Sequence, residues 1–207
     1  MIATNLNGLE LNDSCRFMDK NGIEICSRKY DWVNNFFEGL ASVKLNGKWG
    51  FIDKTGREAI PCKYDNVCSF REGFARVKLI CKWGFIDKTG REICPLKYDY
   101  TSEFYGGLAA VNLNGKWGVI NCLGIEVIPL IFNDLWTFNF ASVVRLDNKY
   151  GLLNYDGDYI LPCQYDTINV FNERIIATKS DTNYEFNLSG ELLNIRNIED
   201  VNFYWVF

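Results

Sequence analysis

The sequence predicts an all-β protein made of tandem repeats of about 34 residues. The segment from Lys48 to Gly56 returns almost unchanged at 82–90 and in weaker form at 116–124 and 149–157. Apolar and polar residues alternate over short segments bounded by turn residues, which is typical of strands joined by hairpins. All four prolines fall in one column of the repeat, namely Pro61, Pro95, Pro129 and Pro162.

The repeat extends over the whole chain, which we interpret as a single repeat domain of residues 1–207. Four clear repeats are expected at 38–71, 72–105, 106–139 and 140–172. Degenerate copies are expected at 1–37 and 173–207, because an end repeat has only one neighbour and must present a different outer face.

Each repeat begins with a predicted strand, which is at 40–45 in the first clear copy. Ala41, Val43 and Leu45 lie on one face of it, as in a half-buried strand. Asn46-Gly47 follows, and this pair tolerates the positive φ angles of a tight hairpin turn. Ile80-Cys81 takes the same place in the next repeat, so that turn is expected to be looser or strained.

The second strand is expected at 48–53 and is apolar on both faces, which indicates a central strand. Gly50 would let another backbone, or an indole of a neighbouring repeat, approach closely. A turn at 54–56 leads to a third strand at 57–60, which Pro61 is expected to end because proline donates no ladder hydrogen bond. Residues 64–70 form a connector or a short fourth strand. We find no segment with the apolar period of an amphipathic helix.

The motif Gly-Leu-Ala-x-Val-x-Leu-Asn-Gly-Lys-Trp-Gly-x-Ile-Asp-x-x-Gly, followed by Ile-Pro and Tyr-Asp, resembles the WG-repeat family of bacterial β-rich repeats. The resemblance covers nearly the whole chain and weakens at both ends and at Tyr150. It implies a repeat module with no shared activity, so no catalytic residue carries over.

Six repeats allow two architectures. They form either an open, solenoid-like array of short antiparallel sheets or a small closed six-bladed propeller. Three strands per repeat is fewer than the four of a typical blade. Copy number in the WG-repeat family is variable, and both points favour the open array.

Composition excludes several classes of protein. The net charge of −4 is spread along the chain with no basic cluster, so we expect no nucleic-acid partner. No run approaches the roughly 18 apolar residues of a membrane span, and the first residues do not read as an export signal, so we expect a cytoplasmic protein. The chain has no histidine, and we expect no cofactor or metal.

The eight cysteines are interpreted as reduced structural thiols, with disulfides or a metal site as alternatives. Cys26 and Cys94 share a column with Ile60 and Ile128, as small buried hydrophobes do.

Two columns of carboxylates allow a structural and a functional interpretation. Asp19, Asp53 and Asp87 either open turns or bind calcium or sugar, and we favour turns because the spacing matches no calcium loop. The Tyr-Asp pairs either pack and cap the connector or bind a ligand. Trp32, Trp136 and Trp205 stand outside the Trp-Gly column. The candidate ligand-binding surface therefore comprises Trp32, Trp136, Tyr64, Asp65, Tyr98 and Asp99.

We predict a non-catalytic scaffold that binds another protein or, as a second choice, a carbohydrate polymer. Glu38 and Glu72 recur one repeat apart, as turn residues do, whereas an active site is normally unique. Serine chemistry lacks a histidine partner, and no phosphate-binding loop occurs. The alternative is a carbohydrate-active hydrolase that uses surface Asp and Glu residues.

Overall fold

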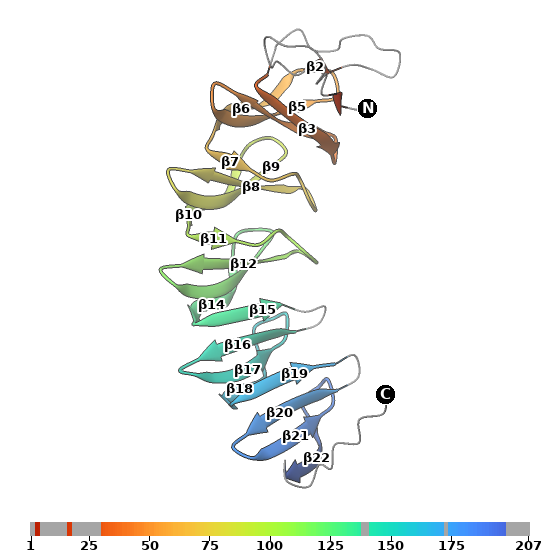
Figure 1. Cartoon of the computed structure of the whole chain (residues 1–207), viewed down its shortest axis with the longest axis vertical. Coiled ribbons are helices and arrows are strands. Elements are labelled where there is room, and N and C mark those ends of the chain that lie inside the picture. The colour runs from red at the N-terminus through yellow and green to blue at the C-terminus, as the bar shows by residue number, and fades with distance from the viewer. Residues whose placement is uncertain (1–2, 5–15, 18–29, 138–140, 172–173, 198–207) are drawn as a thin grey trace. The chain divides into compact units, whose positions relative to one another are not determined.

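The computed structural model describes residues 3–4, 16–17, 30–137, 141–171 and 174–197. These residues form strands, turns and bends with no helix, so the all-β prediction is confirmed. Five antiparallel sheets of four strands follow one another along the chain, and none closes on itself (Figure 1). The predicted first repeat lies largely outside the described residues. From it, β1 (Ala3–Thr4) pairs with β2 (Arg16–Phe17).

The first sheet contains β3 (Trp32–Phe37), β4 (Leu40–Leu45), β5 (Lys48–Asp53) and β6 (Glu58–Tyr64). The second contains β7 (Asn66–Val67), β8 (Phe74–Leu79), β9 (Lys82–Asp87) and β10 (Glu92–Tyr98). The third contains β11 (Tyr100–Thr101), β12 (Leu108–Leu113), β13 (Lys116–Asn121) and β14 (Glu126–Phe132). The fourth contains β15 (Asp134–Thr137), β16 (Ser142–Leu146), β17 (Lys149–Leu153) and β18 (Tyr159–Tyr165). The fifth contains β19 (Thr167–Val170), β20 (Ile175–Lys179), β21 (Thr182–Phe186) and β22 (Leu192–Asn197).

The connector of one repeat supplies the first strand of the next sheet. β7 starts directly after Tyr64-Asp65, and the Asp65 amide donates to the carbonyl of Lys78 at 2.8 Å. Each sheet therefore has four strands, side by side in chain order, rather than the three that alternation alone predicts. Four is the usual number in a propeller blade, so the strand count does not argue against that geometry.

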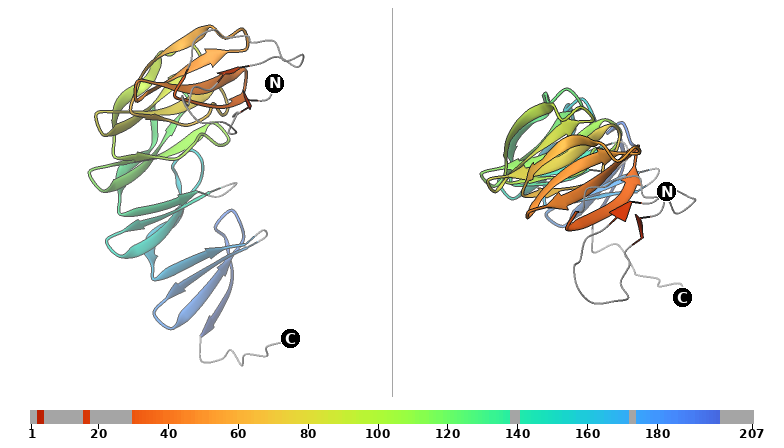
Figure 2. Two further views of the ribbon diagram at one scale, coloured as in Figure 1. Left: turned by 45° about the horizontal axis from the view of Figure 1, so that its top comes forward. Right: turned by 90° about the horizontal axis from the view of Figure 1, so that it is seen from above.

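The chain divides into two compact units, residues 1–114 with 120–125 and residues 115–119 with 126–207. In the first unit, Phe51 of one sheet and Ala75 of the next belong to one buried core. In the second unit, Leu152 and Ala177 are related in the same way. Within each sheet the strands are twisted relative to one another (Figure 2).

The predicted hairpin turns have the expected backbone. Asn46 and Gly47 adopt φ angles of 49° and 78°, the positive pair required by a type I′ turn. Ile80 and Cys81 adopt 48° and 66°, so the turn is kept although neither residue favours it. A positive φ is a genuine outlier for a β-branched residue, which confirms the expectation of strain there.

The glycine of each Trp-Gly pair lies under the backbone of the following strand. A Cβ at Gly50 would stand 2.5 Å from the Ile60 carbonyl oxygen and 2.7 Å from the Cys62 nitrogen. At Gly118 it would stand 2.6 Å from the Ile128 oxygen. The predicted close approach is confirmed, and the approaching backbone is that of the same sheet.

Pro61 does not end its strand, and that prediction is wrong. β6 continues through Pro61 to Tyr64, but the pairing shifts from Ile60 opposite Phe51 to Tyr64 opposite Trp49. Pro61 therefore lies in a bulge of an edge strand, where a missing N–H is tolerated.

The fifth sheet shows that the glycine and the proline act together. In β21, Tyr184 takes the place of the glycine, and Ile195 of β22 takes that of the proline. Pairing there runs without a shift from Thr182 through Glu185. A strand without the proline needs no bulge, so its partner needs no glycine.

A second glycine column joins consecutive sheets. Gly90, Gly124, Gly157 and Gly190 all adopt positive φ in the turn after the second long strand. A Cβ at Gly124 would lie 2.2 Å from the carbonyl oxygen of Ile93 in the preceding sheet, and one at Gly157 would lie 2.3 Å from that of Val127. The turns at Gly124, Gly157 and Gly190 thus rest directly on backbone of the previous repeat, whereas Gly90 lies against the Ile60 side chain.

A Lys-Asp contact also bridges neighbouring sheets. Lys82 of β9 binds Asp99, and the other oxygen of Asp99 accepts from the Asn114 amide in the next hairpin at 2.7 Å. Asp65 and Asp166 bind a lysine and a hairpin amide in the same way. The lysine, followed by the hairpin amide, lowers the pKa of each carboxyl.

We predict that Gly50→Ala lowers the unfolding free energy by about 3 kcal/mol, because the added methyl group meets backbone that cannot move aside. Gly47→Ala is the matched control. Its φ is 78° with nothing within 4 Å of the added atom, so it should cost only about 1 kcal/mol of backbone strain. Urea unfolding measures both, and equal losses would contradict the account.

We also predict that Asp99→Asn reduces the acid sensitivity of the fold. Because the folded state lowers the pKa of Asp99, this group stabilises the protein above its unfolded pKa of about 4 and loses that effect as pH falls through the folded pKa. The wild type should lose more stability than Asp99→Asn between neutral pH and the acid range. Asp181→Asn, on an exposed turn, makes the same charge change and is the matched control. Thermal melts measure both variants, and an Asp99→Asn variant as sensitive to acid as the wild type would contradict the account.

Candidate functional site

The six predicted surface residues do not form one site. Tyr64 and Tyr98 are 0% and 1% exposed, so including them in a binding surface was wrong. The bulge places each tyrosine opposite a tryptophan. Tyr64 belongs to the core that its sheet shares with the next one. Of the two interpretations of the Tyr-Asp column, the structure supports packing.

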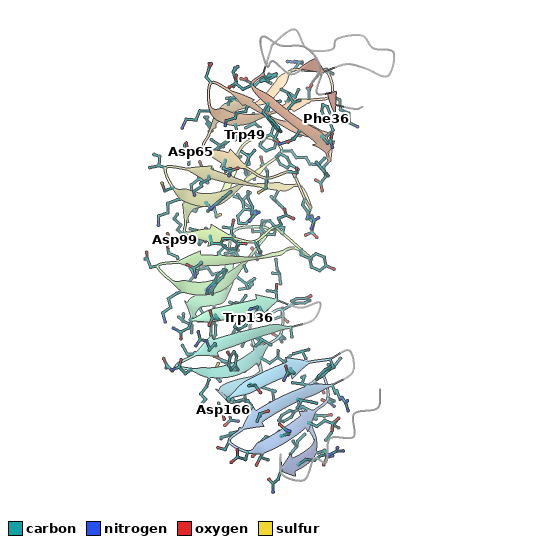
Figure 3. All side chains as sticks on the ribbon, in the orientation of Figure 1. Phe36, Trp49, Asp65, Asp99, Trp136 and Asp166 are labelled. Carbon is teal, nitrogen blue, oxygen red and sulfur yellow. The ribbon has the colours of Figure 1, made fainter. Side chains whose placement is uncertain are left out.

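Asp65 and Asp99 are exposed, but their carboxylates are already engaged. Each holds a lysine of one sheet and a hairpin amide of the next, at the same end of their sheets (Figure 3). A ligand would have to displace both contacts. We therefore assign these aspartates a structural role.

The other carboxylate columns are also committed to turns. One oxygen of Asp53 accepts from the Thr55 amide at 2.8 Å, the Thr55 hydroxyl at 2.6 Å and the Arg57 amide at 3.1 Å. These contacts, the Thr55 side chain first, lower the pKa of Asp53. Asp87 repeats the arrangement, so the turn interpretation is confirmed for both. Asp19 lies outside the described residues.

The carboxylates of Glu38 and Glu72 bind backbone amides of neighbouring turns. Glu38 accepts from the Gly73 amide at 2.9 Å, and Glu72 accepts from the Gly106 and Gly107 amides at 2.9 and 2.8 Å. Each carboxylate thus fastens its own turn to that of the next sheet. Within the described ranges, no group of three or more Cys, Asp or Glu side chains is placed to hold a metal ion.

Cys94 is buried at the position that Ile60 and Ile128 hold in their own sheets, which confirms its behaviour as a small hydrophobe. Burial raises the pKa of its thiol, so it stays protonated near neutral pH. Cys26 of the same column lies outside the described residues.

The two exposed tryptophans differ in their surroundings. Trp32 on β3 is 49% exposed, and its indole N–H donates to Asn34 Oδ1 at 3.1 Å. Trp136 on β15 is 47% exposed and faces the ring of Tyr150, with ring centroids 6.1 Å apart and planes 31° apart. Figure 3 labels Trp136 on its sheet. Trp205 lies outside the described residues.

Trp136 borders a groove of about 260 Å³ in the second unit. Five residues line it: Trp136, Val143, Tyr150, Thr167 and Ile168. We call it the Trp136 groove. Val143 pairs with Trp136 across β15 and β16, whereas Thr167 and Ile168 belong to β19 of the following sheet. The groove therefore lies where two consecutive sheets meet.

The position of Trp136 is polar or small in every other sheet. The corresponding residues are Asn34, Cys68, Ser102 and Asn169. Three of these bond to the neighbouring strand: Asn34 donates to Ser42 Oγ at 2.8 Å, Cys68 Sγ accepts from Arg76 at 3.1 Å, and Ser102 Oγ accepts from the Ala110 amide at 2.9 Å. Only in the fourth sheet does a large aromatic ring replace such a contact.

The second aromatic ring of the groove, Tyr150, is not covered by the basic residue opposite it. In the first sheet, Lys44 stands opposite Trp49 and its ammonium lies 5.7 Å from the ring centroid. Arg145 stands opposite Tyr150 in the same way. Its guanidinium instead binds Asp134, with Nε 2.5 Å from Oδ2. The Arg145 guanidinium therefore lies at Asp134, and the Tyr150 ring contacts Trp136 instead.

Sequence reasoning singled out Trp136 but missed Tyr150 as a member of the site. The available signal was that both residues depart from the repeat in the same copy. Val143 and Ile168 carried no such signal, because apolar residues are common at strand positions.

The described part of the chain contains no helix that could span a membrane. No curated protein matches the sequence. Among solved structures, BamB from Moraxella catarrhalis is 10% identical with a TM-score of 0.38, covering 89% of this chain and 70% of that one. Hsv2 from Kluyveromyces lactis is 10% identical with a TM-score of 0.43, covering 84% and 68%.

A eukaryotic initiation factor is 9% identical with a TM-score of 0.48, covering 91% of this chain. The chain spans only 61% of the length of that structure. Similarity at these levels says nothing about activity.

The model of the WG containing repeat matches residues 16–49, 49–79, 83–117 and 150–179. These segments together make up more than half of the chain and include three of the four Trp-Gly or Tyr-Gly pairs. The matches, the Trp-Gly glycine under its bulged strand and the repeated sheets agree: the chain belongs to the WG-repeat family.

Proposed function

We propose that this WG-repeat protein is a non-catalytic scaffold that binds a protein partner, with the Trp136 groove as the binding site. The observation that carries the proposal is the coincidence of two departures from the repeat, Trp136 and Tyr150, at a single groove. Repetition explains residues that recur in every sheet. It does not explain an exposed aromatic ring where the other copies have a polar or small residue.

The lining favours an apolar side chain of the partner. Val143 and Ile168 offer aliphatic surface, and the two rings offer aromatic surface. A groove of about 260 Å³ is below the roughly 300–1,000 Å³ of sites for drug-sized ligands, but it suits one large side chain. Exposed tryptophan and tyrosine are also the residues that most often dominate the binding energy of protein interfaces.

A sugar is a weaker fit for the same groove. Sugar hydroxyl groups lose hydrogen bonds to water on binding and need polar partners in return. Thr167 supplies the one side-chain hydroxyl in the lining besides that of Tyr150. The nearby charges Asp134 and Arg145 already bind each other. We therefore place carbohydrate binding second.

We predict that Trp136→Asn weakens binding by on the order of 10- to 30-fold, the loss of one aromatic anchor. Asparagine is the residue of the first and fifth sheets at this position, so the fold should tolerate it. Peptides selected from a displayed random library against the full chain would serve as ligands, with affinities measured by fluorescence anisotropy.

Trp32→Asn is the control, because Trp32 is equally exposed but lies outside the groove. It should change affinity by less than about threefold. If both variants lose affinity equally, or if the selected peptides share no apolar residue, the proposal fails. If the wild type binds a glycan array and Trp136→Asn does not, the groove is a carbohydrate-binding site and the protein-binding proposal fails.

We further predict that no single carboxylate is essential. Asp53→Asn, Asp87→Asn, Glu38→Gln and Glu72→Gln should each leave peptide binding within a few-fold, because these groups serve turns. The same variants would be screened for turnover of glycan, peptide and ester substrates. Removing a general acid or base costs roughly 10²–10⁴ in rate. If the wild type turns over a substrate and one of these changes abolishes that turnover, the protein is an enzyme and the scaffold proposal fails.

A further inference from the structure

The Trp136 groove contains hydrogen-bond donors that are not engaged. Among the residues that the structure describes, no group accepts from the Trp136 indole N–H, and none bonds to the hydroxyl groups of Tyr150 and Thr167. The indole N–H of Trp32, by contrast, donates to Asn34 at 3.1 Å. A hydroxyl group can donate or accept, whereas an indole nitrogen can only donate. The groove therefore offers donors to the oxygen atoms of a ligand.

The lining of the groove is uncharged. Its five residues include no side chain that is charged and none that only accepts hydrogen bonds. The basic residue opposite Tyr150, Arg145, already binds Asp134. A charged ligand group would therefore lose water here without gaining an opposite charge. Charge complementarity instead favours a ligand that is uncharged, apolar and rich in carbonyl oxygens.

An ordinary peptide segment fits this lining poorly. Each of its residues brings an N–H group as well as a carbonyl oxygen, and an N–H group against Val143 or Ile168 would lose water and gain no acceptor. Proline has no N–H group, so a run of prolines presents carbonyl oxygens alone. The polyproline II helix that such a run forms has no internal hydrogen bonds, which leaves those oxygens free to accept from the groove.

The size of the groove also favours a ligand that is extended before it binds. A groove of about 260 Å³ suits one large side chain, and residues on one side of a polyproline II helix are about 9 Å apart. Few further contacts are therefore available. A segment that is already ordered in solution loses little conformational freedom on binding, so more of a small contact energy remains as affinity.

We infer that the protein partner is a proline-rich segment in the polyproline II conformation. A proline ring of the segment packs on the rings of Trp136 and Tyr150, and a carbonyl oxygen accepts from the Trp136 indole N–H. Aromatic-lined grooves are a general means of binding such segments. The inference rests on the proposed function, because it names the chemistry of the partner that the Trp136 groove binds.

The direct probe is a fluorescent peptide of about nine prolines, or three turns of the helix, which needs no prior selection. It should saturate the full chain in an anisotropy titration. A control peptide of the same length, built from alternating alanine and glutamine, keeps its backbone N–H groups and should bind at least about tenfold more weakly. A proline peptide that fails to bind at millimolar concentration, or that binds no better than the control peptide, overturns the inference.

Trp136→Phe tests the hydrogen bond, because it keeps an aromatic ring and removes the N–H donor. It should weaken binding of the proline peptide by about fivefold to tenfold. Trp32→Phe is the matched control, since it removes an indole N–H that lies outside the groove and already binds Asn34. Its affinity should stay within about threefold of the wild type. Equal losses in the two variants, or no loss in Trp136→Phe, overturn the inference.

A second measurement applies if the far-ultraviolet spectrum shows that Trp136→Phe does not fold. In the wild type, the Trp136 indole proton should move downfield as the proline peptide saturates the protein, because the N–H group then donates to a carbonyl oxygen. An indole proton that does not move downfield at saturation also overturns the inference.

The outcomes separate this inference from the proposed function. Peptides selected from the random library are compared with variants in which each proline is replaced by alanine. If they need Trp136 but contain no proline, or keep their affinity within about threefold after the replacement, the inference fails and the groove remains the binding site of the scaffold. If they bind the wild type and Trp136→Asn equally well, both fail.

Discussion

The sheets depend on a close backbone contact at the glycine of each Trp-Gly pair. The bulge at Pro61 brings the Ile60 carbonyl oxygen to a place where a Cβ on Gly50 would be only 2.5 Å away. The same bulge sets Tyr64 opposite Trp49, so that both face the next sheet. Tryptophan, glycine, proline and tyrosine recur together because they serve one piece of geometry. The fifth sheet, where tyrosine and isoleucine replace the glycine and the proline, pairs without that shift.

In a repeat scaffold, residues that depart from the repeat are the best candidates for a function. Residues that recur are accounted for by turns, by contacts between sheets or by the core. The fourth sheet departs from the pattern in several linked ways: Trp136 replaces a polar or small residue, Tyr150 replaces tryptophan, and Asp134 draws Arg145 from the ring it would otherwise cover. These changes leave two rings at an apolar groove. The fifth sheet departs from the pattern in another way: Asn183 and Glu185 stand where the fourth sheet has Tyr150 and Leu152.

Local patterns were sufficient for the parts of the fold that depend on neighbours in sequence. Alternation of apolar and polar residues predicted the long strands, and Asn-Gly pairs predicted the hairpin turns. At Ile80 and Cys81 the pair is missing, yet both residues adopt the same positive φ angles, under strain. The strand Asn66–Val67 is too short to show alternation, so the sequence leaves residues 64–70 as either a connector or a strand. The continuation of β6 through Pro61 depends on pairing with β5, which no local signal reports.

The candidate site was predictable only in part, for the same reason. An exposed tryptophan outside the repeat pattern identified Trp136, but the groove exists through contacts between β15, β17 and the next sheet. Tyr64 and Tyr98 were placed on the surface because the sequence does not show which face of a strand the next sheet covers.

The central claim is that ligand binding concentrates at Trp136. The most direct measurement is the indole N–H spectrum of the full chain, with the Trp136 signal identified by its absence in Trp136→Asn, recorded during titration with a selected peptide. The account predicts that the Trp136 signal shifts in proportion to saturation while those of Trp49, Trp83 and Trp117, which serve the repeat, stay in place. Saturating binding that leaves the Trp136 signal unmoved, or that shifts all of these signals alike, would contradict it.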